Sequence, residues 1–315
     1  MLNAWKTLKT LVAAGTLAFA AVHASGAEPE KIILITHGLA SDPYWNIVKH
    51  GANDAAKQLG VTVDYRSPPT FDMVQMSNLI NAAVNQRPAG IIVTIPDANA
   101  LSGAIKNAVA SGIPVISVDS GADVAAKLGT LLHIGQPEYP AGKAVGERLK
   151  SMGLKKAICI NHEVGNTALD DRCRGVKDGF GGNVTVLPTT ADFQQVKSKV
   201  AAALAQDPAV DAVVALSAGQ SGEPAVAAAQ EAKRANLAVV SFDLSPGFLK
   251  AVADGKALFA VEHQPYLFGY LGTVFLANEI RYGLLPTNKV IETGPKFITK
   301  ADAQRVMSLS AKAIR

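Results

Sequence analysis

Two adjacent aromatic residues, Tyr44 and Trp45, follow an acidic turn that comes directly after the apolar run IILIT (32–36). Aromatic side chains at such a position either pack into a core or lie against a ligand. Their flat faces suit the C–H faces of a ring-shaped polyhydroxylated molecule. Asp42 could bond hydroxyl groups, but Asp42-Pro43 is also a common helix start, with Asp as the cap. The stretch therefore predicts either a binding loop or an ordinary cap.

Polar side chains recur where the later apolar runs end. Carboxylates, amides and guanidinium groups can each form paired hydrogen bonds with neighbouring hydroxyls. Each residue also has a structural explanation, because Asp often caps helices, Phe suits a core and a buried His can be satisfied internally. Their shared position after strands predicts one small-molecule site. The predicted ligand-binding residues are His37, Asp42, Tyr44, Trp45, Asp119, Ser120, Asn166, Arg172, Phe193, Ser217, Phe242, Asp243, His263 and Gln264.

Short runs rich in Ile and Val alternate with longer helical stretches along the chain. The runs are 31–36, 61–66, 90–95, 114–119, 131–135, 156–161, 183–188, 212–217, 237–243 and 257–264. Strands of this kind, separated by helices, predict parallel sheets with right-handed crossovers. We expect an α/β fold of two doubly wound parallel-sheet lobes, joined by a hinge of several segments. Because ligands bind at the carboxyl ends of such strands, both sets of ends should face one cleft.

The same pattern divides the chain into a leader and two lobes. Residues 1–27 combine Lys6 and Lys9 with an apolar run and small-residue cleavage sites, which indicates a cleaved signal peptide and a periplasmic protein; the alternative is an uncleaved anchor. The first lobe is predicted to comprise 28–133 plus about 265–290. The second lobe is predicted to comprise 134–264 plus about 291–315.

Charge and motifs argue against several classes of function. The chain has 30 Lys and Arg against 26 Asp and Glu, without a basic stripe, so no nucleic-acid partner is expected. The sequence has no glycine-rich phosphate-binding motif and no His or Cys spacing typical of a metal site. The stretch AGQSGE (218–223) resembles a nucleophile elbow but lacks its second Gly. We expect no enzyme activity, no cofactor and no metal.

Two cysteines, Cys159 and Cys173, fall in a predicted strand and in the helix that follows it. An oxidising compartment favours a disulfide between them. Two buried free thiols are the alternative.

Six short motifs carry a family resemblance: DPYW (42–45), GIPVISVD (112–119), RCRG (172–175), ADF (191–193), SFDLSP (241–246) and QPYLFGY (264–270). Together they resemble the ribose-type, type I periplasmic sugar-binding proteins of ABC importers, over residues 31–291. The resemblance implies ligand contacts from Tyr44, Trp45, Asp119, Arg172, Phe193, Phe242 and Asp243, with His263 at the position of a hinge-side Gln. The chain departs from the ribose pattern at Ser120, at Ser217 and in a longer first loop, so the resemblance does not single out ribose as the ligand.

The resemblance implies a monomeric binding protein that closes over a sugar or polyol and presents it to a membrane permease. Pentoses, hexoses, inositols and acyclic polyols all remain open as ligands. One alternative is a receptor that presents a furanone-like autoinducer to a membrane sensor, and another is a hydrolase on the same scaffold. Related repressors carry a DNA-binding segment where this chain carries the predicted signal peptide.

Overall fold

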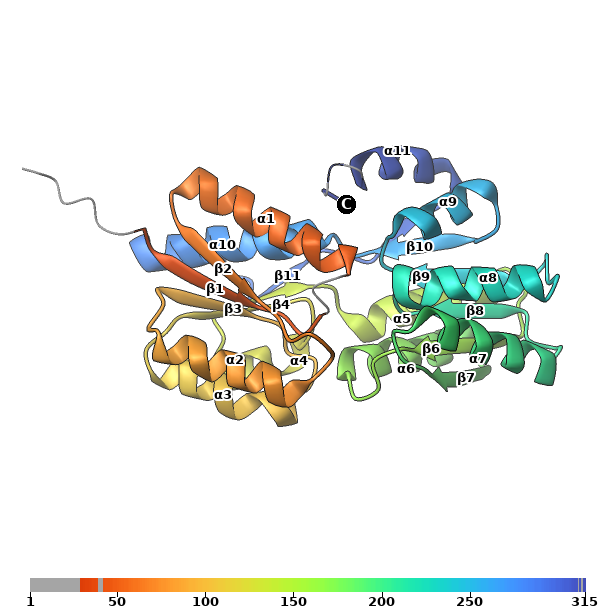
Figure 1. The fold of residues 1–315 in the computed structure, drawn as a ribbon, viewed down its shortest axis with the longest axis horizontal. Coiled ribbons are helices and arrows are strands. Elements are labelled where there is room, and N and C mark those ends of the chain that lie inside the picture. Colours follow the sequence, from red (N-terminus) through yellow and green to blue (C-terminus); the bar gives the residue numbers. More distant parts are fainter. Residues whose placement is uncertain (1–28, 39–41, 311, 313) are drawn as a thin grey trace, which may run out of the picture.

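The structure is a computed structural model that describes residues 29–38, 42–310, 312 and 314–315. The predicted signal peptide (1–27) lies outside the described residues. Figure 1 shows two α/β lobes side by side, with the chain crossing between them at a narrow waist. This arrangement confirms the predicted two-lobe fold.

The first lobe is built on a six-stranded parallel sheet in the order β11-β5-β4-β3-β1-β2. Its strands are β1 (Lys31–Ile35), β2 (Thr62–Arg66), β3 (Gly90–Val93), β4 (Val115–Val118), β5 (His133–Gly135) and β11 (Val290–Glu292). Its helices are α1 (Pro43–Leu59), α2 (Met73–Asn85), α3 (Ala98–Ala110), α4 (Ala122–Ala125), the 3₁₀ turn η1 (Ala126–Leu128) and α10 (Pro265–Tyr282).

The second lobe repeats this plan in the order β12-β10-β9-β8-β6-β7. Its strands are β6 (Lys156–Asn161), β7 (Asn183–Pro188), β8 (Ala212–Ala215), β9 (Ala238–Phe242), β10 (Phe259–Glu262) and β12 (Lys296–Ile298). Its helices are α5 (Glu138–Ser151), α6 (Thr167–Phe180), α7 (Phe193–Gln206), the π-helical turn η2 (Ala218–Gly222), α8 (Glu223–Glu231), α9 (Pro246–Asp254) and α11 (Lys300–Ser310). The prediction of a wholly parallel sheet is wrong for this lobe, because its edge strand β12 pairs antiparallel with β10.

Helices cover both faces of each sheet, which explains why the strands read as unbroken apolar runs. In β1, Ile32 and Leu34 pack towards α1 and α10, while Ile33 and Ile35 pack towards α2 and α3. In the second lobe, α5 and α6 share one face, while α7, α8, α9 and α11 share the other. Among the helices that the structure describes, none has the length and apolar character needed to cross a membrane.

One helix pair in each lobe packs backbone against backbone. A Cβ atom on Gly51 of α1 would lie 2.1 Å from the carbonyl oxygen of Tyr266 in α10. Likewise, a Cβ atom on Gly142 of α5 would lie 2.1 Å from the carbonyl oxygen of Arg172 in α6. Only glycine permits this approach, so both pairs hold fixed positions beside the strand ends.

The chain crosses between the lobes three times, after β5, β10 and β11. The predicted boundaries at 133/134 and about 290/291 are two residues early, because β5 and β11 pair in the first sheet to Gly135 and Glu292. Thr293 N donates to Gly135 O over 3.1 Å, and Gln264 Nε2 donates to Thr293 O over 2.6 Å. The crossing segments therefore lie together as one hinge.

Candidate functional site

A cavity lies between the lobes, at the carboxyl ends of strands from both sheets. The space between the atoms that line it is about 390 Å³ with open solvent included, and about 40 Å³ of it admits the centre of a water-sized sphere. This is the location expected for a ligand site in doubly wound folds. Ten of the fourteen predicted residues line it: His37, Asp42, Tyr44, Trp45, Asp119, Asn166, Arg172, Ser217, Asp243 and His263.

The aromatic pair enters the cavity from the first turn of α1. Asp42 caps this helix, since its Oδ1 accepts from Tyr44 N over 3.0 Å. Its other oxygen accepts from Gln220 Nε2 of the second lobe over 2.6 Å, so Asp42 is both a cap and a wall of the cavity. Trp45 is 5 % exposed and packs edge-on against the ring of His37, with centroids 4.9 Å apart.

Tyr44 joins the first lobe to the hinge. Its hydroxyl donates to Asp119 Oδ1 over 2.8 Å, and His263 Nε2 lies 2.7 Å from the same hydroxyl oxygen. His263 Nε2 also lies 2.8 Å from Asp243 Oδ1. Burial opposes charge on both partners, yet their contact raises the pKa of His263 and lowers the pKa of Asp243. These directions indicate an ion pair that links the hinge to the second lobe.

Asp119 and Asp243 occupy equivalent places in the two lobes. Asp119 follows β4 and Asp243 follows β9, and their φ angles are 64° and 66°. This left-handed backbone is uncommon for residues other than glycine, and such strain clusters at functional sites. Burial raises the pKa of Asp119 to about 6.

Arg172 is held by three residues of its own lobe. Its Nε and one terminal nitrogen donate to the Glu138 carboxylate over 2.5 and 3.0 Å, and its other terminal nitrogen donates to Leu216 O over 3.2 Å. The guanidinium carbon lies 4.9 Å from the centre of the Phe242 ring. Burial lowers the pKa of Arg172, but the Glu138 charge outweighs this effect, so the pKa lies above its usual range. The guanidinium is therefore a fixed cation in the wall.

The loop after β6 supplies the remaining charged groups. Asn166 caps α6 and donates to Glu163 Oε2 over 2.8 Å, and that oxygen lies 3.7 Å from His37 Nε2 of the first lobe. Burial raises the pKa of Glu163 to about 7 and lowers the pKa of His37 to about 3. Burial also lowers the pKa of His162 to about 4. His37 and His162 are thus neutral near pH 7, and Glu163 titrates there.

Four predicted residues do not line the cavity. Phe242 is buried in the core beneath Arg172, so it supports the guanidinium and does not cover a ligand. Phe193 is 41 % exposed at the start of α7 and faces a surface hollow beside Glu223 and Lys250. Ser120 is buried, and Gln264 bonds within the hinge as described above.

The sequence pattern did not single out three polar residues that matter to the site. His162 and Gln220 line the cavity, and Glu138 holds Arg172. Gln220 lies in the π-helical turn η2, a geometry that often marks functional sites. Its stretch, AGQSGE, does not fit a nucleophile motif, but its position directly after β8 is the signal that could have found it.

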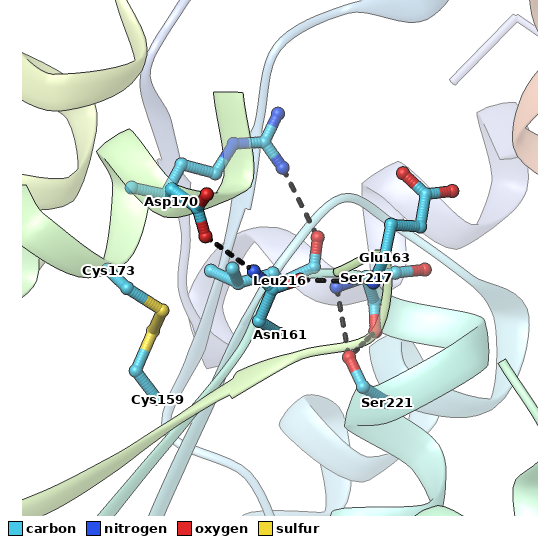
Figure 2. Close-up of a disulfide and its surroundings, with 9 residues drawn as sticks. Cys159, Asn161, Glu163, Asp170, Cys173, Leu216, Ser217 and Ser221 are labelled. Atoms are coloured by element: carbon cyan, nitrogen blue, oxygen red, sulfur yellow. Dashed lines mark hydrogen bonds between the residues drawn. A yellow bond between two sulfur atoms is a disulfide. The ribbon is translucent and has the colours of Figure 1, made fainter. Parts of the chain in front are cut away.

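Cys159 and Cys173 form a disulfide, which settles the choice between a bond and two free thiols. Figure 2 shows this bond beside the hydrogen bond between Asn161 and Asp170. Both links join β6 to α6. Within the described part of the chain, no group of three or more His, Cys, Asp or Glu side chains is placed to hold a metal ion.

The sequence profile described as "Periplasmic binding protein domain" matches residues 32–283. This chain belongs to the periplasmic binding protein family. Members of the family are receptors for transported solutes and not enzymes, which confirms the prediction that this chain is not an enzyme.

Named relatives of this periplasmic binding protein carry sugars or related molecules. The ribose import binding protein of Haemophilus influenzae is 30 % identical over 284 residues, 85 % of this chain and 91 % of that protein. A carbohydrate transporter from Acidothermus cellulolyticus 11B, solved in complex with myo-inositol, is 35 % identical with a TM-score of 0.86, covering 91 % of this chain and all of that one. A periplasmic sugar-binding protein from Legionella pneumophila is 29 % identical with a TM-score of 0.77, covering 85 % of this chain and all of that one.

Proposed function

We propose that this chain captures one neutral sugar or polyol in the periplasm and delivers it to the permease of an ABC importer. The observation that carries the proposal is the cavity between the lobes, lined by polar groups from both sheets and by the rings of Tyr44 and Trp45. Such a wall supports capture without chemistry, because it can bond hydroxyls while a ring lies against an apolar face. The predicted signal peptide supports a periplasmic location, and the chain acts as a monomer in this proposal.

Contacts between the two lobes support a mechanism of closure. Gln220 of the second lobe bonds Asp42 of the first, and Thr167 N and Oγ1 each donate to Pro96 O of the first lobe over 2.9 Å. A ligand that bonds both walls stabilises this closed state over an open one, since it can contact both lobes only when they meet. The closed surface is then what the permease recognises.

The charges of the cavity favour a neutral ligand over an acidic one. Four carboxylates line it, and the cations among the lining residues are Arg172 and the His263 imidazolium, each already paired. The buried lining atoms without a hydrogen-bond partner among the described residues are His162 Nδ1, Gln220 Oε1 and His263 Nδ1, and Asp243 Oδ1 has only its ion-pair contact with His263. The hydroxyl groups of a polyol both donate and accept, so they can bond the Gln220 oxygen as well as a ring nitrogen.

The test uses Trp45, since the only other tryptophan, Trp5, lies in the predicted signal peptide. Trp emission of the purified mature protein is recorded during titration with myo-inositol, D-ribose, D-xylose, L-arabinose and D-allose, with D-glucuronate as the acidic control. We expect a saturable change with at least one neutral compound and none with D-glucuronate. No response in emission or in melting temperature across the panel would overturn the proposal.

Two further measurements separate import from the alternatives. Ligand recovered unchanged after denaturation of the complex argues against a hydrolase. Binding to a permease of an ABC importer in the presence of ligand supports import, and binding to a membrane sensor alone supports the signalling alternative, which the relatives do not support.

A further inference from the structure

The disulfide closes a ring of chain that contains much of the second lobe's wall. Cys159 lies in β6 and Cys173 in α6, 14 positions later, and both are buried. Six cavity-lining residues fall between them: His162, Glu163, Asn166, Ala168, Leu169 and Arg172. We call residues 160–172 the ring segment. The other lining residues of this lobe, Leu216, Ser217, Gln220 and Asp243, lie outside it.

Two hydrogen bonds that hold the end of the turn come from the opposite lobe. Thr167 N and Oγ1 both donate to Pro96 O, so these bonds end when the lobes separate. The turn itself is open, with Val164 64 % exposed and Gly165 in a left-handed conformation. An open protein must therefore hold this turn by other means.

Within the second lobe, two links tie the ends of the ring segment together. Asn161 Nδ2 donates to Asp170 Oδ1 over 2.8 Å, and the covalent bond lies beside it (Figure 2). Asn161 Oδ1 also accepts from Glu163 N over 3.0 Å. A single hydrogen bond is weak compared with a covalent link that restricts the conformations of a loop. The disulfide is thus the covalent restraint that joins the two ends of the ring segment.

We propose that the Cys159–Cys173 bond positions the ring segment for binding while the lobes are apart, and thereby sets ligand affinity. The inference rests on the proposed function, because it concerns the same cavity. Without the bond, closure must also order the turn of the ring segment, and the conformational entropy lost there is subtracted from the free energy of binding. We expect affinity to fall about tenfold, the effect of ordering one or two additional side chains.

The experiment compares the parent with Cys159→Ala/Cys173→Ala, and with Val306→Ala as a control for stability alone. Val306 is buried in α11 of the same lobe, outside the ring segment and the cavity. Where the double alanine variant does not fold, Cys159→Val/Cys173→Ala replaces it and fills more of the space. Each folded protein is titrated with the panel compounds well below its melting temperature. Amide hydrogen exchange of 160–172 is measured without ligand.

The expected result is about tenfold weaker binding in the cysteine variant, with faster exchange confined to 160–172. Val306→Ala should lower the melting temperature and change neither measurement. Parent-like affinity in the folded cysteine variant overturns the inference, and so does faster exchange spread evenly over the lobe. If the parent binds no panel compound, the proposed function fails, and unchanged exchange over 160–172 would still overturn the positioning role.

Discussion

The two lobes repeat one fold but face the cavity with different chemistry. The first lobe presents Tyr44 and Trp45 from a single helix turn, close in sequence to the cap that starts it. The second lobe presents Arg172, whose partners Glu138 and Leu216 are 34 and 44 positions away. A local signal therefore specifies the aromatic wall, whereas distant contacts and a disulfide assemble the charged wall.

This difference shows how a symmetric scaffold can make an asymmetric site. Each sheet places a strained aspartate at a matching strand end, Asp119 in one lobe and Asp243 in the other. The hinge residue His263 joins the two systems, since it contacts both Tyr44 and Asp243. The aromatic wall suits the C–H face of a ring, and the charged wall suits its hydroxyls. The comparison predicts unequal effects of mutation in the two lobes.

The largest effect is expected for Arg172→Ala in the charged wall. It removes a buried charged donor and leaves Glu138 without its partner, so binding should weaken by ~3 kcal/mol, or more than 100-fold. Calorimetric titration with the ligand found by Trp emission measures the loss. Arg174→Ala is the matched control, because Arg174 lies on the same helix with its side chain 62 % exposed. Parent-like binding by folded Arg172→Ala would mean that the charged wall is not the ligand's anchor.

A smaller effect is expected for Trp45→Leu in the aromatic wall. Leucine keeps apolar bulk but loses the flat face, so affinity should fall by ~1–2 kcal/mol, roughly tenfold. Calorimetry is needed because the substitution removes the fluorophore. Tyr282→Leu, at an exposed position 66 % accessible in α10, should bind like the parent. If Trp45→Leu lost as much affinity as Arg172→Ala, the prediction that the charged wall contributes more to binding than the aromatic wall would be wrong.

The third prediction concerns pH and Glu163. The pKa of Glu163, raised by burial to about 7 from an ordinary 4.5, means that its protonated form stabilises the fold. That contribution is present below about pH 4.5 and is lost as pH rises through 7. Glu163→Gln cannot ionise, so its melting temperature should rise relative to the parent by a few degrees between about pH 5 and 8.

Differential scanning calorimetry across that pH range measures the difference between Glu163→Gln and the parent. Glu147→Gln, with its side chain 60 % exposed on α5, is the control for loss of a carboxylate outside the cavity. A flat difference for Glu163→Gln would show that the carboxyl is charged throughout, as an ordinary surface carboxylate is.

The smallest effect is expected for Phe193→Ala. The family resemblance implies that this ring covers the ligand, but the structure places it on the surface away from the cavity lining. Affinity should therefore change by less than about twofold, within the range of surface substitutions. A loss as large as that of Trp45→Leu would show that α7 brings this ring into the ligand-bound site.

Much of the fold could be predicted because its signals are local. Apolar runs such as 31–36 and 156–161 became β1 and β6 to within a residue, and Pro43 and Pro265 begin the predicted helices α1 and α10. The edge strand β12 was missed, because three residues give little pattern. Strand ends also located most of the site, since the fold fixes where they meet.

The rest of the site depends on contacts that leave no local pattern. Glu138 reads as an ordinary acidic residue in the first turn of a helix, and only the fold brings it to Arg172. Phe193 illustrates the opposite error. Its motif matches the family, but Asp192 caps α7 directly before it, and that helix start directs the ring outward.

The interleaved course of the chain has a consequence for the order of folding. The first lobe needs α10 to cover α1 and β11 to complete its sheet. Both segments follow β6 to β10 in the chain, so they are synthesised after most of the second lobe. A nascent chain that ends before residue 265 therefore leaves apolar α1 residues such as Val48 and Ala52 uncovered. Neither lobe is complete until its last segment arrives, so the finished fold of either lobe waits until nearly the whole chain has been made.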